Sequence, residues 1–123
     1  MLNTCKIAAF VATGNPERSR VFYETVLGLK FISDEQYAIV FDANGTTLRI
    51  QKVQEVAPIP YTALGWHVTN IEKMVAELTD QGVKFEFFEG FGQDEIGIVT
   101  FPNGAKVAWF KDPDGNMLSL DQY

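Results

Sequence analysis

The hydrophobic and polar positions of the chain follow a pattern that occurs twice. An apolar strand, first at 6–13 and then at 62–69, is followed each time by an asparagine that can cap a helix. Apolar residues then recur at helical spacing until a glycine ends the segment. The two asparagines, Asn15 and Asn70, lie 55 residues apart. The pattern therefore predicts two βα units built on one plan.

Three further strands are expected after each helix. In the first half they cover 29–33, 36–42 and 46–52, and in the second half 83–88, 105–112 and 117–121. The turn at 42–45 carries an Asn-Gly hairpin signal, and the turn at 112–115 matches it 70 residues later. Residues 95–101 explain most of the extra length in the second half as an additional hairpin arm.

The complete pattern is βαβββ twice, within an α+β fold. We expect a single domain over residues 1–123, with a first module at 4–53, a proline-bearing connector at 54–60 and a second module at 61–123. Pairing the two modules would form one curved mixed sheet, a cup with helices on its convex face. A ferredoxin-like sandwich also contains two βα units, but the third strand of each half and the two long turns favour the cup.

Composition limits the class of protein. No apolar run reaches the roughly 18–20 residues of a membrane span, and the first residues do not form a signal peptide. A net charge of −6 without a Lys/Arg cluster argues against nucleic acid as a partner. The single cysteine, Cys5, is expected to be an ordinary strand residue in a reducing compartment. We therefore expect a cytoplasmic protein that binds neither nucleic acid nor membrane.

Three segments of the sequence resemble one known superfamily. They are 19–31, which reads SRVFYETVLGLKF, 111–120, which reads KDPDGNMLSL, and 64–82. Together with the internal repeat, they resemble the vicinal-oxygen-chelate superfamily, which includes glyoxalases, extradiol dioxygenases and bleomycin resistance proteins. The resemblance covers nearly the whole chain and implies the cup-shaped fold.

Members of this superfamily that use a metal hold a divalent ion with four side chains. By the resemblance, these positions correspond to Ala8, Arg49, Ala63 and Ser119. Two methyl groups, a guanidinium and a lone hydroxyl are not a ligand set for Zn²⁺, Ni²⁺ or Fe²⁺. The resemblance therefore implies the metal-free branch, with no cofactor. In that branch, bleomycin resistance proteins bind their ligand in clefts of a homodimer.

Side-chain alternation from those four positions assigns a face to each strand. The positions of opposite parity are aliphatic, as expected beneath helices. In the third strands the hairpin turns predict Val40 and Phe110 inward and Ile39 and Trp109 outward, and a β-bulge would reverse such a pair. The glycine-rich loop at 90–92 is expected to close over the cup as a flap. The candidate ligand contacts are Phe10, Arg49, Gln51, His67, Phe88, Phe91, Trp109, Phe110, Ser119 and Asp121.

The charged candidates allow more than one interpretation. A buried Arg49 needs either a carboxylate partner, for which Asp121 is the internal candidate, or an anionic ligand. His67, the only histidine, could contact a ligand, act as a general base or be a polar residue with satisfied hydrogen bonds. Acidic side chains near the rim would favour a cationic group: Glu86, Glu89 and Asp94.

These expectations favour a metal-independent protein that binds or sequesters a planar organic molecule, such as an aromatic antibiotic, as a homodimer. No residue is assigned a catalytic role. The alternative is an enzyme of the superfamily, a lyase, isomerase or dioxygenase. Such an enzyme would keep an atypical metal site through His67, Gln51 and Asp121. Otherwise it would use His67 for metal-free acid–base catalysis on a carboxylate anchored by Arg49.

Overall fold

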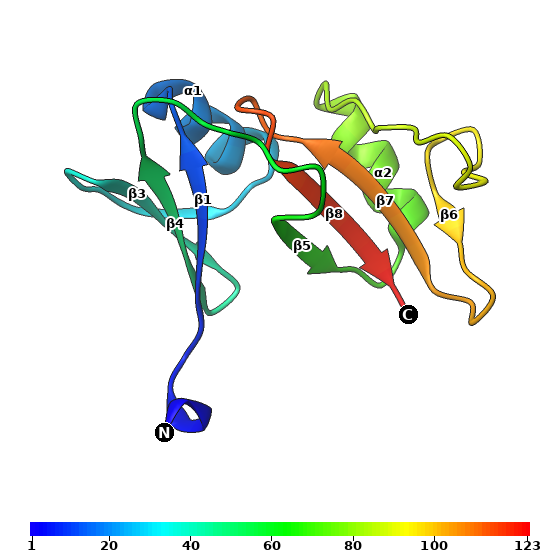
Figure 1. Cartoon of the computed structure of the whole chain (residues 1–123), viewed down its shortest axis with the longest axis horizontal. Coiled ribbons are helices and arrows are strands. Elements are labelled where there is room, and N and C mark those ends of the chain that lie inside the picture. The colour runs from blue at the N-terminus through cyan, green and yellow to red at the C-terminus, as the bar shows by residue number, and fades with distance from the viewer. The chain divides into compact units, whose positions relative to one another are not determined.

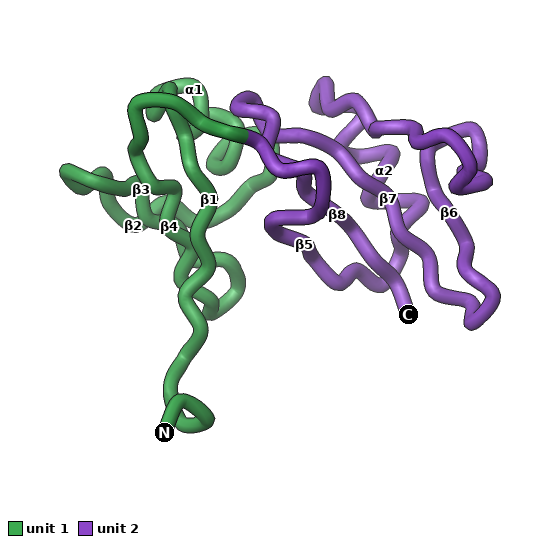
Figure 2. Tube along the Cα trace, viewed as in Figure 1, with its two compact units in different colours: residues 1–57 green, residues 58–123 purple.

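The computed structural model describes all residues from 1 to 123 and divides into two compact units, 1–57 and 58–123 (Figure 2). The boundary between the units falls inside the predicted connector at 54–60. Each unit contains one βαβββ module, which confirms the repeat predicted from the sequence (Figure 1).

The first unit contains one four-stranded sheet, a short 3-10 helix at its start and one longer helical segment. Its elements are η1 (Leu2–Thr4), β1 (Ala8–Thr13), α1 (Pro16–Val21), η2 (Phe22–Val26), β2 (Lys30–Asp34), β3 (Ala38–Ala43) and β4 (Thr46–Lys52). The strand order is β1-β4-β3-β2, with β1 parallel to β4 and the other neighbours antiparallel. α1 packs against β4 and continues into η2, which is a π-helical turn.

The second unit repeats this arrangement. Its elements are β5 (Leu64–His67), α2 (Ile71–Asp80), β6 (Val99–Thr100), β7 (Lys106–Lys111) and β8 (Met117–Gln122). The strand order is β5-β8-β7-β6, with β5 parallel to β8 and the other neighbours antiparallel. In Figure 1, α2 runs behind β7 and β8 and packs on that face of the sheet. None of the helices in the structure has the length and apolar character needed to cross a bilayer.

Both helices begin where the sequence predicts. The side chains of Asn15 and Asn70 each accept the backbone N–H three residues later, at 3.2 and 3.1 Å. In α2, the first backbone N–H, that of Ile71, also donates to the Gln122 side chain at 2.8 Å. This bond ties the start of the helix to the end of β8.

The helix-covered face of each sheet carries the hydrophobic core. In the first unit, Leu48 and Ile50 are fully buried and Ile39 is 1% exposed. Ile39 lies opposite Ile50, and Val40 lies opposite Arg49 on the other face. The predicted faces of β3 are therefore confirmed, because cross-strand partners share a face.

The two hairpin turns differ by one residue, and this difference sets the faces of β7. In the first unit, Asn44 and Gly45 form a two-residue turn in which both φ angles are positive, at 51° and 96°. In the second unit, the Asp112 N–H donates to the Asn116 carbonyl at 3.0 Å. These two residues enclose a three-residue loop, in which Gly115 has a φ angle of 88°. One extra loop residue shifts the register by one position and turns each β7 side chain to the opposite face.

The predicted faces of Phe110 and Trp109 are consequently wrong. Phe110 lies opposite Leu118, is fully buried and packs against Phe85 with the ring centroids 5.4 Å apart. Trp109 lies opposite Ser119 on the face that α2 does not cover. The sequence analysis allowed for such a reversal through a β-bulge, but here it comes from the longer loop and the β7–β8 register is unbroken.

The predicted strand at 83–88 is also wrong. The segment pairs with β7 only through a single β-bridge between Phe85 and Phe110, in which the Glu86 N–H donates to the Trp109 carbonyl at 2.8 Å. The Phe88 N–H donates instead to the Gln93 side chain at 2.6 Å, because the chain turns away from β7 at this point. Within the predicted arm at 95–101, only Val99–Thr100 pairs with β7.

Gly65 on the edge strand β5 and Ser119 on the neighbouring strand β8 approach each other closely. A Cβ atom on Gly65 would lie 2.5 Å from the Ser119 hydroxyl oxygen. Gly65→Ala is therefore expected to destabilise the protein by about 1–3 kcal/mol through overpacking. The same change in a Ser119→Ala background should cost much less, since the clashing atom is gone. Urea denaturation of the unchanged protein, the two single variants and the double variant measures this coupling, and additive losses would contradict the contact.

Candidate functional site

An aromatic pocket lies on the uncovered face of the second sheet. It has a volume of about 280 Å³ and lies wholly within the unit 58–123. Its walls come from residues 60–62 before β5, from the loop that carries Phe88 and Phe91, and from the two central strands, β7 and β8. The lining residues are Pro60, Tyr61, Thr62, Phe88, Phe91, Trp109 and Met117.

Three aromatic rings form the main wall of this pocket. Phe88 and Phe91 both meet Trp109 edge to face, with ring centroids 5.5 and 5.4 Å apart. The two phenylalanine rings lie 5.6 Å from each other. The indole N–H of Trp109 donates to the Thr62 hydroxyl at 3.2 Å, which fixes the plane of the ring. Such a wall presents ring edges and faces to a planar ligand.

The loop that carries Phe88 and Phe91 is held by one side chain. Gln93 accepts the Phe88 N–H and donates to the carbonyls of Glu86 and Gly97, both at 2.8 Å. The glycines at 90 and 92 have positive φ angles of 83° and 67°, which lets the chain turn tightly around Phe91. The phenylalanines are thus positioned by a side-chain network, and Phe91 remains 48% exposed.

An ion pair lies beside the aromatic wall. Lys111 lies opposite Met117 in the sheet, and its amine is 3.6 Å from the Glu86 carboxylate. Of the acidic side chains predicted to favour a cation, Glu86 is thus paired with a lysine. Asp94 instead accepts the backbone N–H groups of Ile96 and Ile98 at 3.0 and 2.9 Å. Two of the three carboxylates predicted at the rim are therefore already bonded within the protein.

His67 and Asp121 form a hydrogen-bonded pair on neighbouring strands of the second sheet. The His67 Nδ1 atom bonds to the Asp121 carboxylate, and the Tyr123 ring lies 5.6 Å from the imidazole. The His67 side chain is 81% exposed and that of Asp121 is 19% exposed. The carboxylate orients the ring and leaves Nε2 open to solvent, an arrangement that suits proton transfer.

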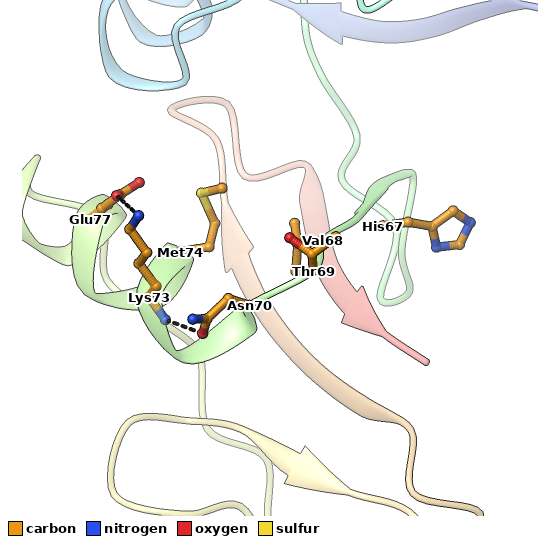
Figure 3. Close-up of a pocket in the computed structure, with 7 residues that line it drawn as sticks. All are labelled: His67, Val68, Thr69, Asn70, Lys73, Met74 and Glu77. Atoms are coloured by element: carbon orange, nitrogen blue, oxygen red, sulfur yellow. Dashed lines mark hydrogen bonds and ion pairs between the residues drawn. The ribbon is translucent and has the colours of Figure 1, made fainter.

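A second hollow of about 340 Å³ borders the start of α2. It is lined by His67, Val68, Thr69, Asn70, Lys73, Met74 and Glu77. Figure 3 shows the His67 ring pointing away from the helix, while Lys73 and Glu77 form an ion pair of 4.0 Å along it. Asn70 and Gln122 already occupy two backbone N–H groups at this helix end. The hollow therefore brings no reactive groups together.

The carboxylate partner of Arg49 within its own unit is Glu35, which the sequence analysis did not name. The guanidinium donates to Glu35 at 3.1 Å, whereas Asp121 bonds to His67. Ser33 also donates to Glu35, at 3.0 Å. These hydrogen bonds, that of Arg49 first, hold the pKa of Glu35 below its usual value. Sequence reasoning missed Glu35 because it lies in a turn, outside the strand periodicity.

The Arg49–Glu35 pair should make the free energy of unfolding depend on pH. A carboxylate whose pKa is lowered by folding stabilises the protein above its unfolded pKa, and this contribution disappears as the pH falls through the lowered, folded value. We expect Glu35→Gln to remove that acid-dependent part of the unfolding free energy. Urea denaturation from neutral to acidic pH measures it in both proteins. Parallel curves would contradict the pairing.

The four positions related by resemblance to metal ligands do not form a ligand set in the structure. Ala8 and Ala63 carry only methyl groups, and the Ser119 hydroxyl packs over Gly65. Arg49 places a positive charge at the fourth position, bonded to Glu35. No group of three or more His, Cys, Asp or Glu side chains is arranged to hold a metal ion. The donor chemistry of these residues does not suit a divalent cation.

The structure brings together only part of the predicted contact set. Phe88, Phe91 and Trp109 line the aromatic pocket, and Ser119 is the cross-strand neighbour of Trp109. His67 and Asp121 form their own pair on the same sheet. Phe110 belongs to the core. In the first unit, Phe10, Arg49 and Gln51 share the face opposite α1.

Sequence reasoning missed the contribution of residues 60–62, at the junction of the connector and the second module, to the pocket. Pro60, Tyr61 and Thr62 line it although they precede β5. The signal that could have found them is an aromatic and a hydroxyl residue directly before an edge strand, since such residues lie beside the open face. Met117 was placed on that face by alternation without being named a ligand contact.

Comparison with known proteins assigns the chain to a superfamily. The family model described as Glyoxalase/Bleomycin resistance protein/Dioxygenase superfamily matches residues 5–120. The chain therefore belongs to this superfamily, as the resemblance in its sequence implied. A search of curated proteins gave no match.

Solved structures share the fold over nearly the full length of the chain. Lactoylglutathione lyase from Agrobacterium tumefaciens is 15% identical, with a TM-score of 0.75 over 97% of this chain and 93% of that one. Fosfomycin resistance protein FosX from Listeria monocytogenes is 11% identical, with a TM-score of 0.76 over 95% and 91%. An integron cassette protein from the metagenome of a Halifax Harbour sewage outfall is 20% identical, with a TM-score of 0.72 over 98% and 99%. At these identities the similarity establishes the fold alone.

Proposed function

We propose that this protein binds a planar organic molecule without a metal ion, in the aromatic pocket of its second unit. The observation that carries the proposal is the wall formed by Phe88, Phe91 and Trp109 around a cavity of about 280 Å³. Aromatic and apolar linings with a few polar groups are typical of sites for small organic ligands. The Thr62 hydroxyl supplies a polar group in the lining, and the Lys111–Glu86 pair belongs to the same unit but lies outside the lining.

Metal independence is supported by the chemistry of the four positions. Alanine, alanine, arginine and serine offer no ligand set that would hold a catalytic divalent ion. Protein purified without chelator should therefore contain far less than one equivalent of zinc, nickel, iron or manganese by elemental analysis. A near-stoichiometric content of any of them would overturn this part of the proposal.

The biological setting that we propose is sequestration of an aromatic compound, such as an antibiotic, by a cytoplasmic homodimer. One structural relative is a fosfomycin resistance protein by name, and the superfamily includes bleomycin resistance proteins. Light scattering coupled to gel filtration checks the oligomeric state, with a dimer mass expected. Growth of bacteria that express the chain, on a panel of aromatic antibiotics, checks the protective role.

Fluorescence of Trp109 provides a direct binding test. The chain has two tryptophans, and Trp66 lies opposite Leu120 on the helix-covered face. In a Trp66→Phe protein, Trp109 is the sole tryptophan, so a ligand that stacks in the pocket should quench its emission. A panel of aromatic compounds, cationic, neutral and anionic, would be titrated. Phe91→Ala is expected to weaken any hit by about tenfold, as loss of one stacked ring costs about 1 kcal/mol or more. If no compound class quenches Trp109 or raises the melting temperature, the proposal fails.

A second candidate function is metal-free acid–base catalysis by His67. The observation that favours it is the bond between His67 Nδ1 and the Asp121 carboxylate, which orients the imidazole and leaves Nε2 accessible. Any turnover found with the purified protein should then fall by about 10²–10⁴-fold in His67→Ala. Turnover that is unchanged in this variant would rule out the role.

A further inference from the structure

The first unit has an open sheet face that carries a row of hydrogen-bond donors. Thr47, Arg49 and Gln51 alternate along β4, opposite in parity to the buried Leu48 and Ile50. β4 lies inside the sheet, between β1 and β3, so this row runs along the middle of the face rather than its edge.

Most neighbours of this row are small or apolar. Ala8 and Asp42 lie on either side of Thr47, Phe10 and Val40 on either side of Arg49, and Ala12 and Ala38 on either side of Gln51. The one acidic neighbour, Asp42, lies at the end of the row and accepts the Gly45 N–H at 3.0 Å. Phe10 is 55% exposed and offers a ring face or edge next to the guanidinium.

Arg49 is only partly used by the protein itself. A guanidinium has five N–H donors, and Arg49 makes one hydrogen bond, from its terminal nitrogen to Glu35 at 3.1 Å. The Glu35 side chain is 48% exposed and that of Arg49 is 32% exposed. An exposed pair with a single hydrogen bond contributes little, so a better-matched anion can replace the glutamate. A planar carboxylate can take two parallel N–H groups of the arginine, which Glu35 does not.

We propose that Arg49 is the anchor of a binding site for an aromatic carboxylic acid. The ligand carboxylate would displace Glu35 and accept two guanidinium N–H groups, its ring would contact Phe10, and Thr47 or Gln51 would add a hydrogen bond. The overall charge of −6 disfavours anions in general, so binding has to come from this local arrangement. The site lies wholly in the first unit and does not depend on the aromatic pocket of the second.

Glu35 and Asp34 provide a matched pair of variants for the test. The two carboxylates are neighbours in the chain, at the end of β2 and directly after it, but Asp34 pairs with Lys52 at 2.6 Å rather than with Arg49. Benzoate is titrated while backbone amide chemical shifts are followed by NMR, with benzamide as the neutral analogue and inorganic phosphate as a second anion. Shifts are expected in β1 and β4, for benzoate and not for benzamide.

Removing the competing carboxylate should strengthen binding. Glu35→Gln is expected to raise benzoate affinity by about three- to tenfold, because the ligand no longer displaces a charged partner. Asp34→Asn removes the same charge one residue away and should change the affinity by less than about twofold. Equal gains in the two variants would mean that only the general charge matters, which overturns the proposal.

Removing the anchor should abolish the site. Arg49→Gln is expected to weaken benzoate at least about tenfold, whereas Arg20→Gln, on α1, should not. If Arg49→Gln does not fold, the Glu35→Gln gain still decides the question. Absence of shifts at the highest soluble benzoate concentration would overturn the site. Tighter binding of phosphate than of benzoate would overturn the assignment to an aromatic carboxylate.

Discussion

Phe110→Ala is expected to lower the free energy of unfolding by about 3–5 kcal/mol. The ring is fully buried on the helix-covered face of the second sheet, opposite Leu118 and against Phe85. Truncation removes the whole ring from a packed core and leaves a cavity that the strands cannot close. Urea denaturation followed by circular dichroism measures the loss.

Trp109→Ala is the control for this assignment. Trp109 is the neighbour of Phe110 in β7 but lines the aromatic pocket and is only partly buried. We expect its truncation to cost less than about 2 kcal/mol in stability, since solvent can fill the space. Ligand quenching and ligand-induced stabilisation should be lost instead. A larger stability loss in Trp109→Ala than in Phe110→Ala would mean that the faces of β7 are reversed.

Asp112→Ala is expected to destabilise the protein by about 2–4 kcal/mol. The carboxylate is 5% exposed and accepts the backbone N–H groups of Asp114 and Asn116, both at 2.9 Å. It also accepts the side-chain amide of Asn116 at 2.8 Å. Alanine would leave buried donors without an acceptor in the loop that sets the β7–β8 register. Thermal and urea unfolding give the size of the effect.

Asp42→Ala tests whether that loss is specific to the second turn. Asp42 occupies the matching position in the first unit but accepts only one N–H, that of Gly45, at 3.0 Å near the surface. The two-residue turn there is set by the positive φ angles of Asn44 and Gly45 rather than by a buried carboxylate. We expect a loss below about 1 kcal/mol. Similar losses in the two variants would show that the two turns are held in the same way.

How well the sequence predicted each residue of the site depended on the kind of interaction that holds that residue in place. Phe88 and Phe91 were found because glycines and aromatics mark an exposed loop, and the pocket does contain both. The partner of Arg49 was not found, because a side chain in a turn can reach several positions and no periodicity selects one. The hydrogen bonds of the Gln93 side chain were not predicted for the same reason. Three backbone groups meet this one amide only after the loop has folded.

The repeat, both helix starts and the aliphatic faces of β3, β4 and β8 follow from local sequence patterns. Strand alternation, helical spacing and asparagine caps are local rules, and each needs only a few neighbouring residues to operate. The faces of β7 depend instead on the folded hairpin, where one extra residue in the loop after Asp112 reversed Phe110 and Trp109. A hairpin register depends on hydrogen bonds across the turn, which the hydrophobic pattern of one strand does not encode. For the same reason only the folded chain showed that Trp109, with Phe88 and Phe91, forms the wall of a pocket.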